Sequence, residues 1–417
     1  MPAFDALLFD LDGTLVATDR FWVQAARTGA RRAFEALDLE RVLPSSADWM
    51  RLVGLPLEAG FDTLFADLTK EQRDTIRAAC VEEEHRLLDA GGAALMPGAE
   101  RSLDALARSG VRMAVASNCS QAYLDHMWKA LGLERWMEAG LCLDSPGIGD
   151  KADMLEALLD RFETRSAVMI GDRATDGLAA RANGLPFVFC RFGFAPGGEG
   201  VEAAAVIEDF SELAGVLDER HRGLAKVLEE CGARRETFVP PSILGVAGAP
   251  GSGATLFARD LARQLGADFV SLDMFQNPTS EAPLALDFDR IERELFEPRS
   301  RGERVRLTGT VTDAGGVPSD LELVARPDRL LVVESPALLD PRLSARTDRL
   351  VVTQAEEGES LSRIAGRDAR RYGPSSLEAL RGRFRAWCGL IEPGALARIA
   401  DLVVDLTNPL APVIATA

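Results

Sequence analysis

Cysteine, basic charge and long hydrophobic runs are scarce in this chain, and each shortage excludes a class of protein. No two of the six cysteines form a CxxC pair, so we expect free thiols in a reducing cytosol rather than a disulfide framework or a zinc site. The six are Cys80, Cys119, Cys142, Cys190, Cys231 and Cys388. No apolar run reaches the ~18 residues of a membrane span, and no basic segment precedes the first acidic residues. We therefore expect a cytoplasmic protein without a membrane partner.

The shortage of basic residues limits the partners further. Lys and Arg number 47 against 65 Asp and Glu, which gives a net charge of −18. Such a surface repels nucleic acid and anionic membranes, so we expect neither as a partner. A local loop can still bind an anion inside an acidic protein. Small phosphorylated molecules are therefore compatible with this composition.

What the chain does contain is an alternation of strand and helix patterns that occurs twice. Short apolar runs at residues 4–9, 111–118, 165–172 and 186–192 are separated by helical stretches, which is typical of a parallel sheet with crossover helices. A second alternation begins after the two prolines of "VPPS". The 417 residues suit two or three domains. We expect an α/β protein with two domains, each built on a parallel sheet.

The expected domain boundaries follow from these patterns. Residues 1–215 should form the first domain, with a Rossmann-like core (1–15 and 96–215) and a helical cap (16–95). Within the cap, apolar residues recur at spacings of three and four. Residues 216–241 should form a helical linker, and residues 242–417 a second α/β domain.

The strongest local signal is the run DLDGTL, directly after the first expected strand. Asp10 and Asp12 lie two residues apart on a strand-end loop, so both carboxylates can converge on one phosphoryl group. One carboxylate can attack phosphorus while the other acts as general acid and base. Taken alone, the motif also fits an acidic turn with no chemistry.

Later strand-end positions strengthen the phosphoryl-transfer interpretation. The hydroxyl of Ser117 and the amides after it can hold phosphate oxygens, and Lys151 at a helix start can neutralise developing charge. Asp172 and Asp176, four residues apart, suit Mg²⁺, which prefers carboxylate oxygens. Singly, these residues also fit a helix cap, a surface charge and a turn acid. Their shared position at strand ends, in this order, favours a catalytic site.

Together these motifs resemble the haloacid dehalogenase superfamily of phosphohydrolases over residues 1 to about 215. The resemblance implies that Asp10 is the nucleophile, forming an aspartyl-phosphate, and that Asp12 is the acid/base. It implies a Mg²⁺ ion bound by Asp10, Asp172 and the main-chain carbonyl of Asp12, with Asp176 in support. It also implies a phosphate-binding set of Gly13, Thr14, Ser117, Asn118 and Lys151.

The second aspartate and the cap refine this resemblance. Dehalogenases of the superfamily lack an aspartate at the position of Asp12, which favours a phosphatase. The segments RLVGLPLEAGF and MPGAERSLDALARSGVRMAVASN are similar to phosphoglycolate phosphatase-like members, whose caps close over small phosphomonoesters. A phosphomutase is a weaker alternative. Arg20 and Arg51 of the cap could touch the substrate, although a solvated helix face is the commoner role for such residues.

A glycine loop opens the second expected domain. The run GVAGAPGSGATLF, residues 245–257, has the outline of the phosphate-binding loop G-x-x-x-x-G-K-[ST]. Its amides at a helix N-terminus form a candidate anion site of Gly248, Gly251, Ser252, Gly253 and Thr255. Ala254 stands where the motif has a lysine, and we expect that loss to slow phosphoryl transfer on the order of a thousandfold.

Residues 238–408 resemble the uridine kinase and phosphoribulokinase family of P-loop proteins around this loop. The matching positions are Asp273 on the substrate side, Glu334 on the Mg²⁺ side, and the lid arginines Arg363, Arg367, Arg370 and Arg371. Met274, Ala282 and Ser335 depart from the family's pattern, as Ala254 does. The resemblance therefore implies a kinase-like domain that no longer transfers phosphate.

The resulting hypothesis is a Mg²⁺-dependent phosphatase joined to a pseudokinase-like domain. Its substrate would be a sugar phosphate, a polyol phosphate or a phosphoglycolate-like acid. The second domain would regulate the first, bind a nucleotide or another anion, or form a homo-oligomer. The alternative is a bifunctional phosphatase–kinase, in which a lid arginine replaces the missing lysine and a nucleoside or sugar is phosphorylated. A second domain that binds no ligand and only packs is a third interpretation.

Overall fold

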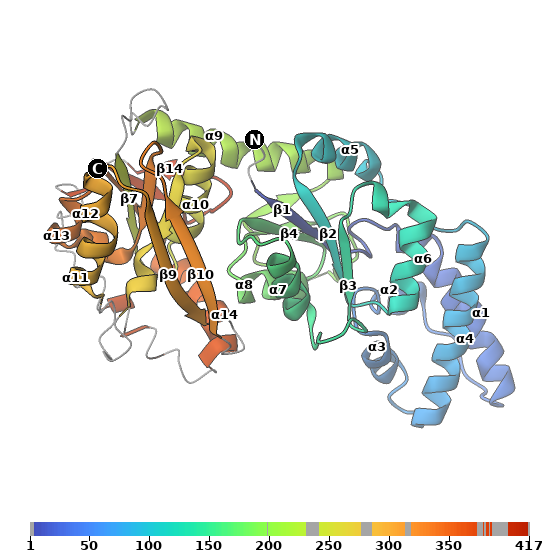
Figure 1. The fold of residues 1–417 in the computed structure, drawn as a ribbon. Helices are drawn as coiled ribbons and strands as arrows, with labels where there is room; N and C mark the ends of the chain where they lie inside the picture. The colour runs from blue at the N-terminus through green and yellow to red at the C-terminus, as the bar shows by residue number, and fades with distance from the viewer. Residues whose placement is uncertain are drawn as a thin grey trace. The chain divides into compact units, whose positions relative to one another are not determined.

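The computed structural model describes residues 4–197, 199–230, 242–276, 286–312, 318–372, 378, 381–382, 384–385 and 399–415. The chain divides into two compact units, Pro2–Val216 and Leu217–Ala417. Each unit contains a six-stranded sheet that is wholly or mostly parallel (Figure 1). The α/β fold class predicted from the alternating patterns is therefore confirmed.

The sheet of the first unit places three strand ends side by side. Its strands are β1 (Ala6–Phe9), β2 (Arg112–Ser117), β3 (Ala139–Cys142), β4 (Ala167–Gly171), β5 (Phe187–Cys190) and β6 (Ala205–Ile207). They are parallel and follow the order β3-β2-β1-β4-β5-β6. All four residues of β1 are buried, as expected for the centre of a parallel sheet. The carboxyl ends of β1, β2 and β4 are neighbours, at the edge where open α/β sheets bind ligands.

Helices pack against this sheet. They are α5 (Ala99–Ser109), α6 (Gln121–Leu131), α7 (Lys151–Arg161), α8 (Ala174–Ala182) and the 3-10 turns η2 (Leu133–Arg135) and η3 (Phe210–Glu212). Leu155 of α7 and Ala180 of α8 join Leu8 of β1 in one buried cluster. Because side chains alternate along a strand, Phe9 faces the other side of the sheet, where its ring stacks on Phe210 at 6.2 Å.

A helical cap separates β1 from β2. It consists of the 3-10 turn η1 (Thr18–Arg20) followed by α1 (Trp22–Ala36), α2 (Ser46–Met50), α3 (Leu57–Leu64) and α4 (Lys70–Asp89). The fully buried ring of Trp49 lies 5.9 Å from that of Phe61 and 5.8 Å from that of Phe65. α4 begins at a capping box, in which Thr69 and Gln72 each bond the other's main-chain N–H. The cap thus has an aromatic core of its own.

The second unit is built around β7. Its sheet contains β7 (Ile243–Gly248), β8 (Asp268–Ser271), β11 (Leu331–Glu334), β12 (Arg349–Gln354), β13 (Leu402–Asp405) and β14 (Val413–Ile414), and an antiparallel ribbon is formed by β9 (Val305–Thr312) and β10 (Pro318–Ala325). The strand order is β14-β13-β12-β7-β11-β8, and only β14 is antiparallel to its neighbour. The end of β7, where the glycine loop starts, therefore lies between the ends of β11 and β12.

Two layers of helices bury this second sheet. The elements are α9 (Leu213–Glu230), α10 (Ala254–Leu265), η4 (Leu272–Phe275), α11 (Phe288–Ile291), the π-helix η5 (Glu292–Phe296), α12 (Glu297–Ser300), η6 (Pro336–Leu339), α13 (Pro341–Ser344) and α14 (Glu357–Tyr372). Leu224 of α9 and Phe257 of α10 pack on Leu244 of β7 in one cluster. Ile291 and neighbouring residues of η5 pack with Ala247 of β7 in another.

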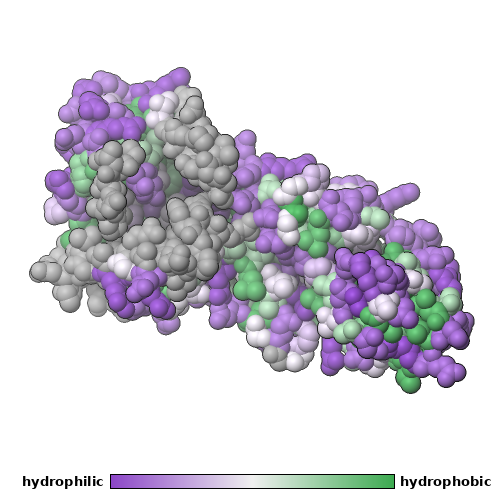
Figure 2. Space-filling model, turned by 90° about the horizontal axis from the view of Figure 1, so that it is seen from below, coloured by the Kyte–Doolittle hydropathy of each residue, from purple (hydrophilic) through white to green (hydrophobic). Residues whose placement is uncertain are grey.

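The face shown in Figure 2 is largely hydrophilic. Hydrophilic residues cover much of the face shown in Figure 2, and hydrophobic residues form smaller areas on it. The large apolar side chains most exposed in the described residues, Val42, Leu178 and Val413, lie far apart in the sequence, and single exposed apolar residues are ordinary. In the same residues, no helix has both the length and the apolar character needed to cross a membrane.

Candidate active site

Three aspartates meet at the carboxyl edge of the first sheet. Asp10 follows β1 and Asp172 follows β4, and these strands are paired with Phe9 opposite Ile170. Asp176 lies in the first turn of α8. One carboxylate oxygen from each aspartate lies within 4.8 Å of the other two, and all three residues are buried. The sheet thus brings together the acidic residues that the sequence motifs predicted at this edge.

Lys151 holds two of these carboxylates. It is the first residue of α7, whose start is fixed by a capping box between Asp150 and Asp153. Its Nζ donates to Asp10 Oδ1 and to Asp176 Oδ1, each at 2.6 Å. Burial lowers the pKa of Lys151, but the negative charges of Asp10 and Asp176 together raise it by a larger amount. The pKa of Lys151 therefore lies above its ordinary value, and the ammonium group stays charged.

The acidic triad still has unsatisfied oxygens. Asp10 Oδ2 and Asp172 Oδ1 are buried, and no donor in the described part of the chain bonds to either oxygen. Burial and the neighbouring charges of Asp10 and Asp176 raise the pKa of Asp172, and burial raises the pKa of Asp176 to about 6. Buried carboxylate oxygens without partners are unfavourable unless a cation pairs with them. The donor set therefore fits a hard divalent cation, and Mg²⁺ prefers such oxygens.

Asp12 has a different set of partners. Its Oδ1 accepts hydrogen bonds from Thr18 Oγ1 at 2.5 Å and from the Tyr123 hydroxyl at 2.6 Å. Burial raises the pKa of Asp12 by more than these two hydrogen bonds lower it, so the pKa lies above its ordinary value. Gly13 follows with φ of +78°, and a Cβ there would approach Asp172 Oδ2 to 2.2 Å. Only glycine meets both the backbone conformation and the close approach.

The predicted phosphate-binding side chains lie at the same edge. Ser117 is the last residue of β2 and is 2% exposed, and its Oγ accepts a hydrogen bond from the Cys119 N–H at 3.3 Å. Thr14, in the turn after Asp12, is fully buried. The Asn118 side chain donates to the carbonyl of Gly54 in the cap at 3.0 Å. In this structure the Asn118 amide therefore bonds the cap, a contact that sequence analysis did not foresee.

Arg173 is a second link between core and cap. Its guanidinium donates to the carbonyl of Val53 and forms an ion pair with Glu199 at 3.2 Å. Gly54 has φ of +82°, and a Cβ there would lie 3.1 Å from Arg173 Cγ. The cap turn at Val53 and Gly54 is thus held to the core by Arg173 and Asn118. By contrast, the cap arginines Arg20 and Arg51 are not buried, and Arg51 pairs with Asp48 on its own helix turn.

Sequence analysis also missed Thr18, Tyr123 and Glu84. Glu84 is 7% exposed on α4, and burial and the charge of Asp12 raise its pKa to about 8. A signal for it was present. Ile76, Cys80 and Leu88 are buried at spacings of four or eight, and Glu84 occupies the same stripe. A carboxyl group in the buried stripe of a helix is rare without a specific role.

In the second unit, the glycine loop joins β7 to α10. Gly251 and Gly253 have φ of +80° and +88°, and Gly253 caps α10. Ser252 Oγ lies 2.8 Å from Thr353 Oγ1 of β12. Ala254 is 6% exposed and joins the apolar cluster that contains Phe257. The structure therefore buries a methyl group at the position where the motif has a lysine.

Glu334 is brought to the same edge by strand pairing. It ends β11 and lies opposite Val246 of β7 and Ser271 of β8. Ser271 Oγ donates to Glu334 Oε2 at 3.0 Å. Burial and the charge of Asp273 raise the pKa of Glu334 to about 7, while hydrogen bonds from Ser271 and Thr255 lower it. Thr255, Asp273 and Glu334 thus interact at this edge of the second sheet.

The other predicted residues of this unit have structural contacts or lie outside the described part. The Arg363 guanidinium donates to the main-chain carbonyls of Gly251 at 3.3 Å, Leu406 at 3.0 Å and Thr407 at 2.8 Å. Ser335 caps η6, and Met274 packs on an apolar cluster. Ala282 and the side chains of Arg367, Arg370 and Arg371 lie outside the described part of the chain. Arg363 therefore supports the loop backbone in this structure.

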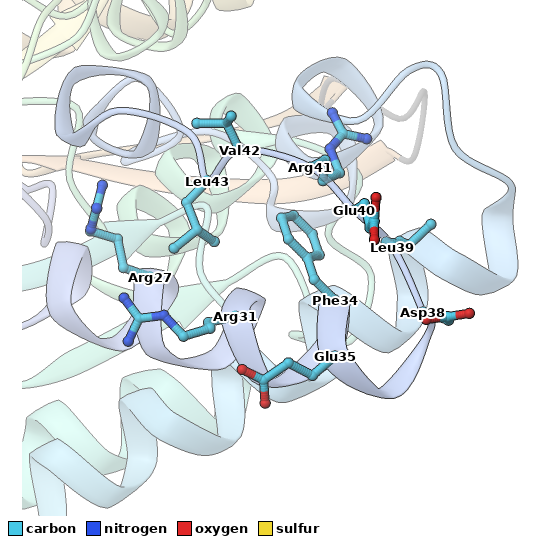
Figure 3. Close-up of a pocket in the computed structure, with 10 residues that line it drawn as sticks. All are labelled: Arg27, Arg31, Phe34, Glu35, Asp38, Leu39, Glu40, Arg41, Val42 and Leu43. Carbon is cyan, nitrogen blue, oxygen red and sulfur yellow. The ribbon is translucent and has the colours of Figure 1, made fainter.

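A surface cavity of about 580 Å³ lies elsewhere on the cap (Figure 3). It is lined by the second half of α1 and the segment after it, including Arg27, Phe34 and Arg41. The Arg27 guanidinium donates to the carbonyl of Pro44 at 3.1 Å, and that of Arg41 pairs with Asp67 and lies over the Phe34 ring. These cations stabilise the cap itself, and none of the residues lining the cavity belongs to the aspartate cluster.

Comparison with known proteins identifies the family to which the first unit is similar. A family model for haloacid dehalogenase-like hydrolases matches residues 4–184. A phosphoglycolate phosphatase from Rhodospirillum rubrum is 31% identical over 219 residues, which cover 50% of this chain and 88% of that protein. A crystal structure described as a predicted phosphoglycolate phosphatase from Haemophilus somnus is 19% identical, with a TM-score of 0.46 over 52% of this chain and 99% of that one.

One relative has a different activity in its name. A shikimate kinase from Chlorobium phaeobacteroides is 24% identical over 176 residues, 40% of this chain and 86% of that protein. An identity this low does not identify the second unit as a kinase. The second unit is therefore an α/β domain of unassigned role.

Proposed function

The chain belongs to the haloacid dehalogenase-like hydrolases and is a phosphatase, and from this premise we propose that it hydrolyses a small phosphomonoester through an aspartyl-phosphate on Asp10. One observation carries the proposal. Asp10 has one carboxylate oxygen bonded to Lys151 and a second that is buried without a partner, amid the other acidic residues of the triad. An activated carboxylate at a strand end is what nucleophilic attack on phosphorus requires.

The first step forms the aspartyl-phosphate. A carboxylate oxygen of Asp10 bonds to phosphorus while the bond from phosphorus to the substrate's alcohol oxygen breaks. Asp12, protonated at this stage, gives its proton to the departing oxygen. Lys151 keeps its positive charge between Asp10 and Asp176, where it stabilises the negative charge of the transferred group.

The second step releases inorganic phosphate. Asp12, now ionised, takes a proton from a water molecule whose oxygen bonds to phosphorus, and the bond between phosphorus and Asp10 breaks. Asp10, Asp172 and Asp176 would hold Mg²⁺ with the Asp12 carbonyl, and the bound ion would supply positive charge to the phosphate oxygens. Ser117 and Lys151 would hold the phosphate itself.

The substrate class follows from the cap and from the relatives. Asn118 and Arg173 bond the cap turn at Val53 and Gly54 to the core, and a cap held this close favours a small leaving group. The named relative supports a phosphoglycolate-like acid, and sugar and polyol phosphates have similar dimensions. We propose substrates of this size.

The first test is Asp10→Asn assayed with p-nitrophenyl phosphate and Mg²⁺. We expect turnover to fall on the order of a thousandfold or more, because the amide is a poor nucleophile. Removing divalent cations with EDTA should have a similar effect on the wild-type protein, reversed by adding Mg²⁺. Asp5→Asn is the matched control, since Asp5 lies at the other end of β1 and accepts a hydrogen bond from Thr164. Substantial residual turnover by pure Asp10→Asn protein would refute the assignment.

For the second unit we propose an anion-binding, pseudokinase-like domain. The buried methyl of Ala254 and the engagement of Arg363 by carbonyl groups support a loop that no longer transfers phosphate. The contact of Thr255 with Glu334 favours the alternative of a working kinase. ATP consumption by the Asp10→Asn protein against nucleosides, phosphosugars and shikimate separates the two. Robust formation of a phosphorylated product would overturn the pseudokinase proposal.

A further inference from the structure

Two hydroxyl groups converge on one oxygen of Asp12. Thr18 and Tyr123 both donate to Oδ1, at 2.5 and 2.6 Å. Among the described residues, no donor is bonded to Oδ2 of this carboxyl group. Because Oδ1 is already occupied twice, Oδ2 is the oxygen left to exchange a proton with the substrate or with water.

The two donors come from different parts of the first unit. Thr18 lies in η1, where the chain enters the cap, whereas Tyr123 lies in the first turn of α6, just after β2. Ser120 caps α6 by accepting a hydrogen bond from the main-chain N–H of Tyr123 at 3.3 Å. Tyr123 itself is 7% exposed. The position of the Tyr123 hydroxyl is therefore set by the core of the unit.

The phenol of Tyr123 is suited to act as a fixed donor. Burial, together with the negative charges of Asp12 and Glu84, raises the pKa of Tyr123 well above its usual value. Stacking of His85 on His126 at 6.3 Å holds the Glu84 segment of α4 against α6. A phenol that stays protonated donates one hydrogen bond and does not compete with Asp12 as a base.

We propose that Tyr123 is a positioning residue for proton transfer: its hydroxyl fixes the Asp12 carboxyl group so that Oδ2 faces the oxygen that leaves phosphorus. The inference rests on the proposed roles of Asp10 and Asp12. A carboxyl group that rotates freely presents the correct oxygen to its proton acceptor for only part of the time, and correct orientation is a large part of catalysis. Tyr123 acts through Asp12 and need not touch the substrate.

The test compares two substrates of similar size whose leaving groups differ in acidity. p-Nitrophenol leaves phosphorus with little need for a proton, whereas the weaker acid phenol depends on one. We expect Tyr123→Phe to lower kcat/KM about tenfold or more for phenyl phosphate and no more than about threefold for p-nitrophenyl phosphate, within the range of general acid catalysis. The ratio of the two values does not depend on the folded fraction, because both come from one preparation.

Two controls separate positioning from a structural role. Thr164→Val removes a hydroxyl group that donates to the Asp5 carboxylate at 2.8 Å. This substitution should leave the ratio of the two kcat/KM values at its wild-type value. In an Asp12→Asn background, Tyr123→Phe should not change the ratio further, because residues that act as a unit are not additive. An additional change in that background would contradict the proposal.

The outcomes also distinguish this inference from the function on which it rests. Equal losses for both substrates, or no loss for either, would overturn the role of Tyr123 while Asp10→Asn stays inactive. Turnover by Asp10→Asn would overturn the proposed function itself. A selective loss with phenyl phosphate that Thr164→Val does not reproduce would establish the positioning role.

Discussion

At the scale of single residues, the carboxyl group of Glu84 is the most exceptional feature of the cap. It is 7% exposed on α4, and burial together with the negative charge of Asp12 raises its pKa. Asp12 lies close enough for its charge to raise the pKa of Glu84, and Glu84 in turn raises the pKa values of Tyr123 and Cys80. A buried acid with a raised pKa binds its proton more tightly in the folded chain than in the unfolded one.

This makes the stability of the protein depend on pH in a defined direction. The pKa of Glu84 rises from an ordinary 4.5 to about 8, so its contribution should weaken the folded state progressively as pH rises from about 4.5 to about 8. We expect the free energy of unfolding of Glu84→Gln to exceed that of the wild type at pH 8 by on the order of 4 kcal/mol, with little difference at pH 4.5. Urea titrations at several pH values measure this.

The matched control for that prediction is Glu82→Gln. Glu82 is an exposed residue two positions earlier on the same helix, and it pairs with Arg32. We expect its substitution to change stability by less than about 1 kcal/mol at any of these pH values, because exposed ion pairs contribute little. A difference between Glu84→Gln and wild type that does not vary with pH would contradict the buried-acid interpretation.

At the scale of elements, the cap is joined to the core through one turn. Asn118, just after β2, and Arg173, just before α8, both donate to carbonyl groups of the turn at Val53 and Gly54. Arg173 also donates its main-chain N–H to Asp176 Oδ2 at 3.0 Å. A residue beside the acidic triad thereby also holds the cap, so we expect a movement of the cap to alter the geometry of the site.

We expect Asn118→Ala to raise KM for a small phosphate ester by roughly fivefold, as loss of one hydrogen bond of about 1 kcal/mol predicts. The inhibition constant of inorganic phosphate should stay near its wild-type value, because the side chain holds the cap. Steady-state kinetics with phosphate as product inhibitor measures both quantities. Parallel increases in both would instead assign the side chain to phosphate binding, as the family resemblance implies.

Asn183→Ala is the control for this substitution. The Asn183 side chain donates to the carbonyl group of Ala152 in α7 and to that of Ala179 in its own helix, α8, each at 3.0 Å. It removes the same kind of hydrogen bond without touching the cap. Its KM should therefore be close to that of the wild-type protein.

At the scale of the whole molecule, each unit has a core of its own. The first sheet is buried by α7 and α8, and the second by α9 and α10 on one face, with separate apolar clusters. Among the residues that the structure describes, the acidic triad and its bonded partners lie within Pro2–Val216. We therefore expect phosphatase chemistry to need no side chain of the second unit.

We accordingly expect a chain that ends at residue 216 to fold and to keep kcat for p-nitrophenyl phosphate within about twofold of the full chain, as compact domains usually do. Circular dichroism and steady-state kinetics on the two proteins measure this. A folded but inactive fragment would show that the second unit contributes to the site. A fragment with the same kcat but an altered response to added ATP would indicate regulation by the second unit.

Much of the first site could be predicted because its residues follow strands directly. Asp10, Ser117 and Asp172 each stand at or just after the end of an apolar run, and parallel strands bring such ends to one edge. Tyr123, Thr18 and Glu84 could not be placed in this way. They lie on helices and turns, and their local sequence does not predict which strand end they approach.

The sequence by itself determined the α/β class and pointed to the carboxylates to which we assign the phosphatase chemistry, because strand periodicity and strand-end motifs are local properties. Only the tertiary structure decided that Asp12 is held by Tyr123, that Asn118 and Arg173 bond the cap, and that Arg363 supports a loop without a lysine. These contacts join residues far apart in the chain. They depend on how helices pack on the sheets, and that packing brings distant residues within hydrogen-bonding distance of one another.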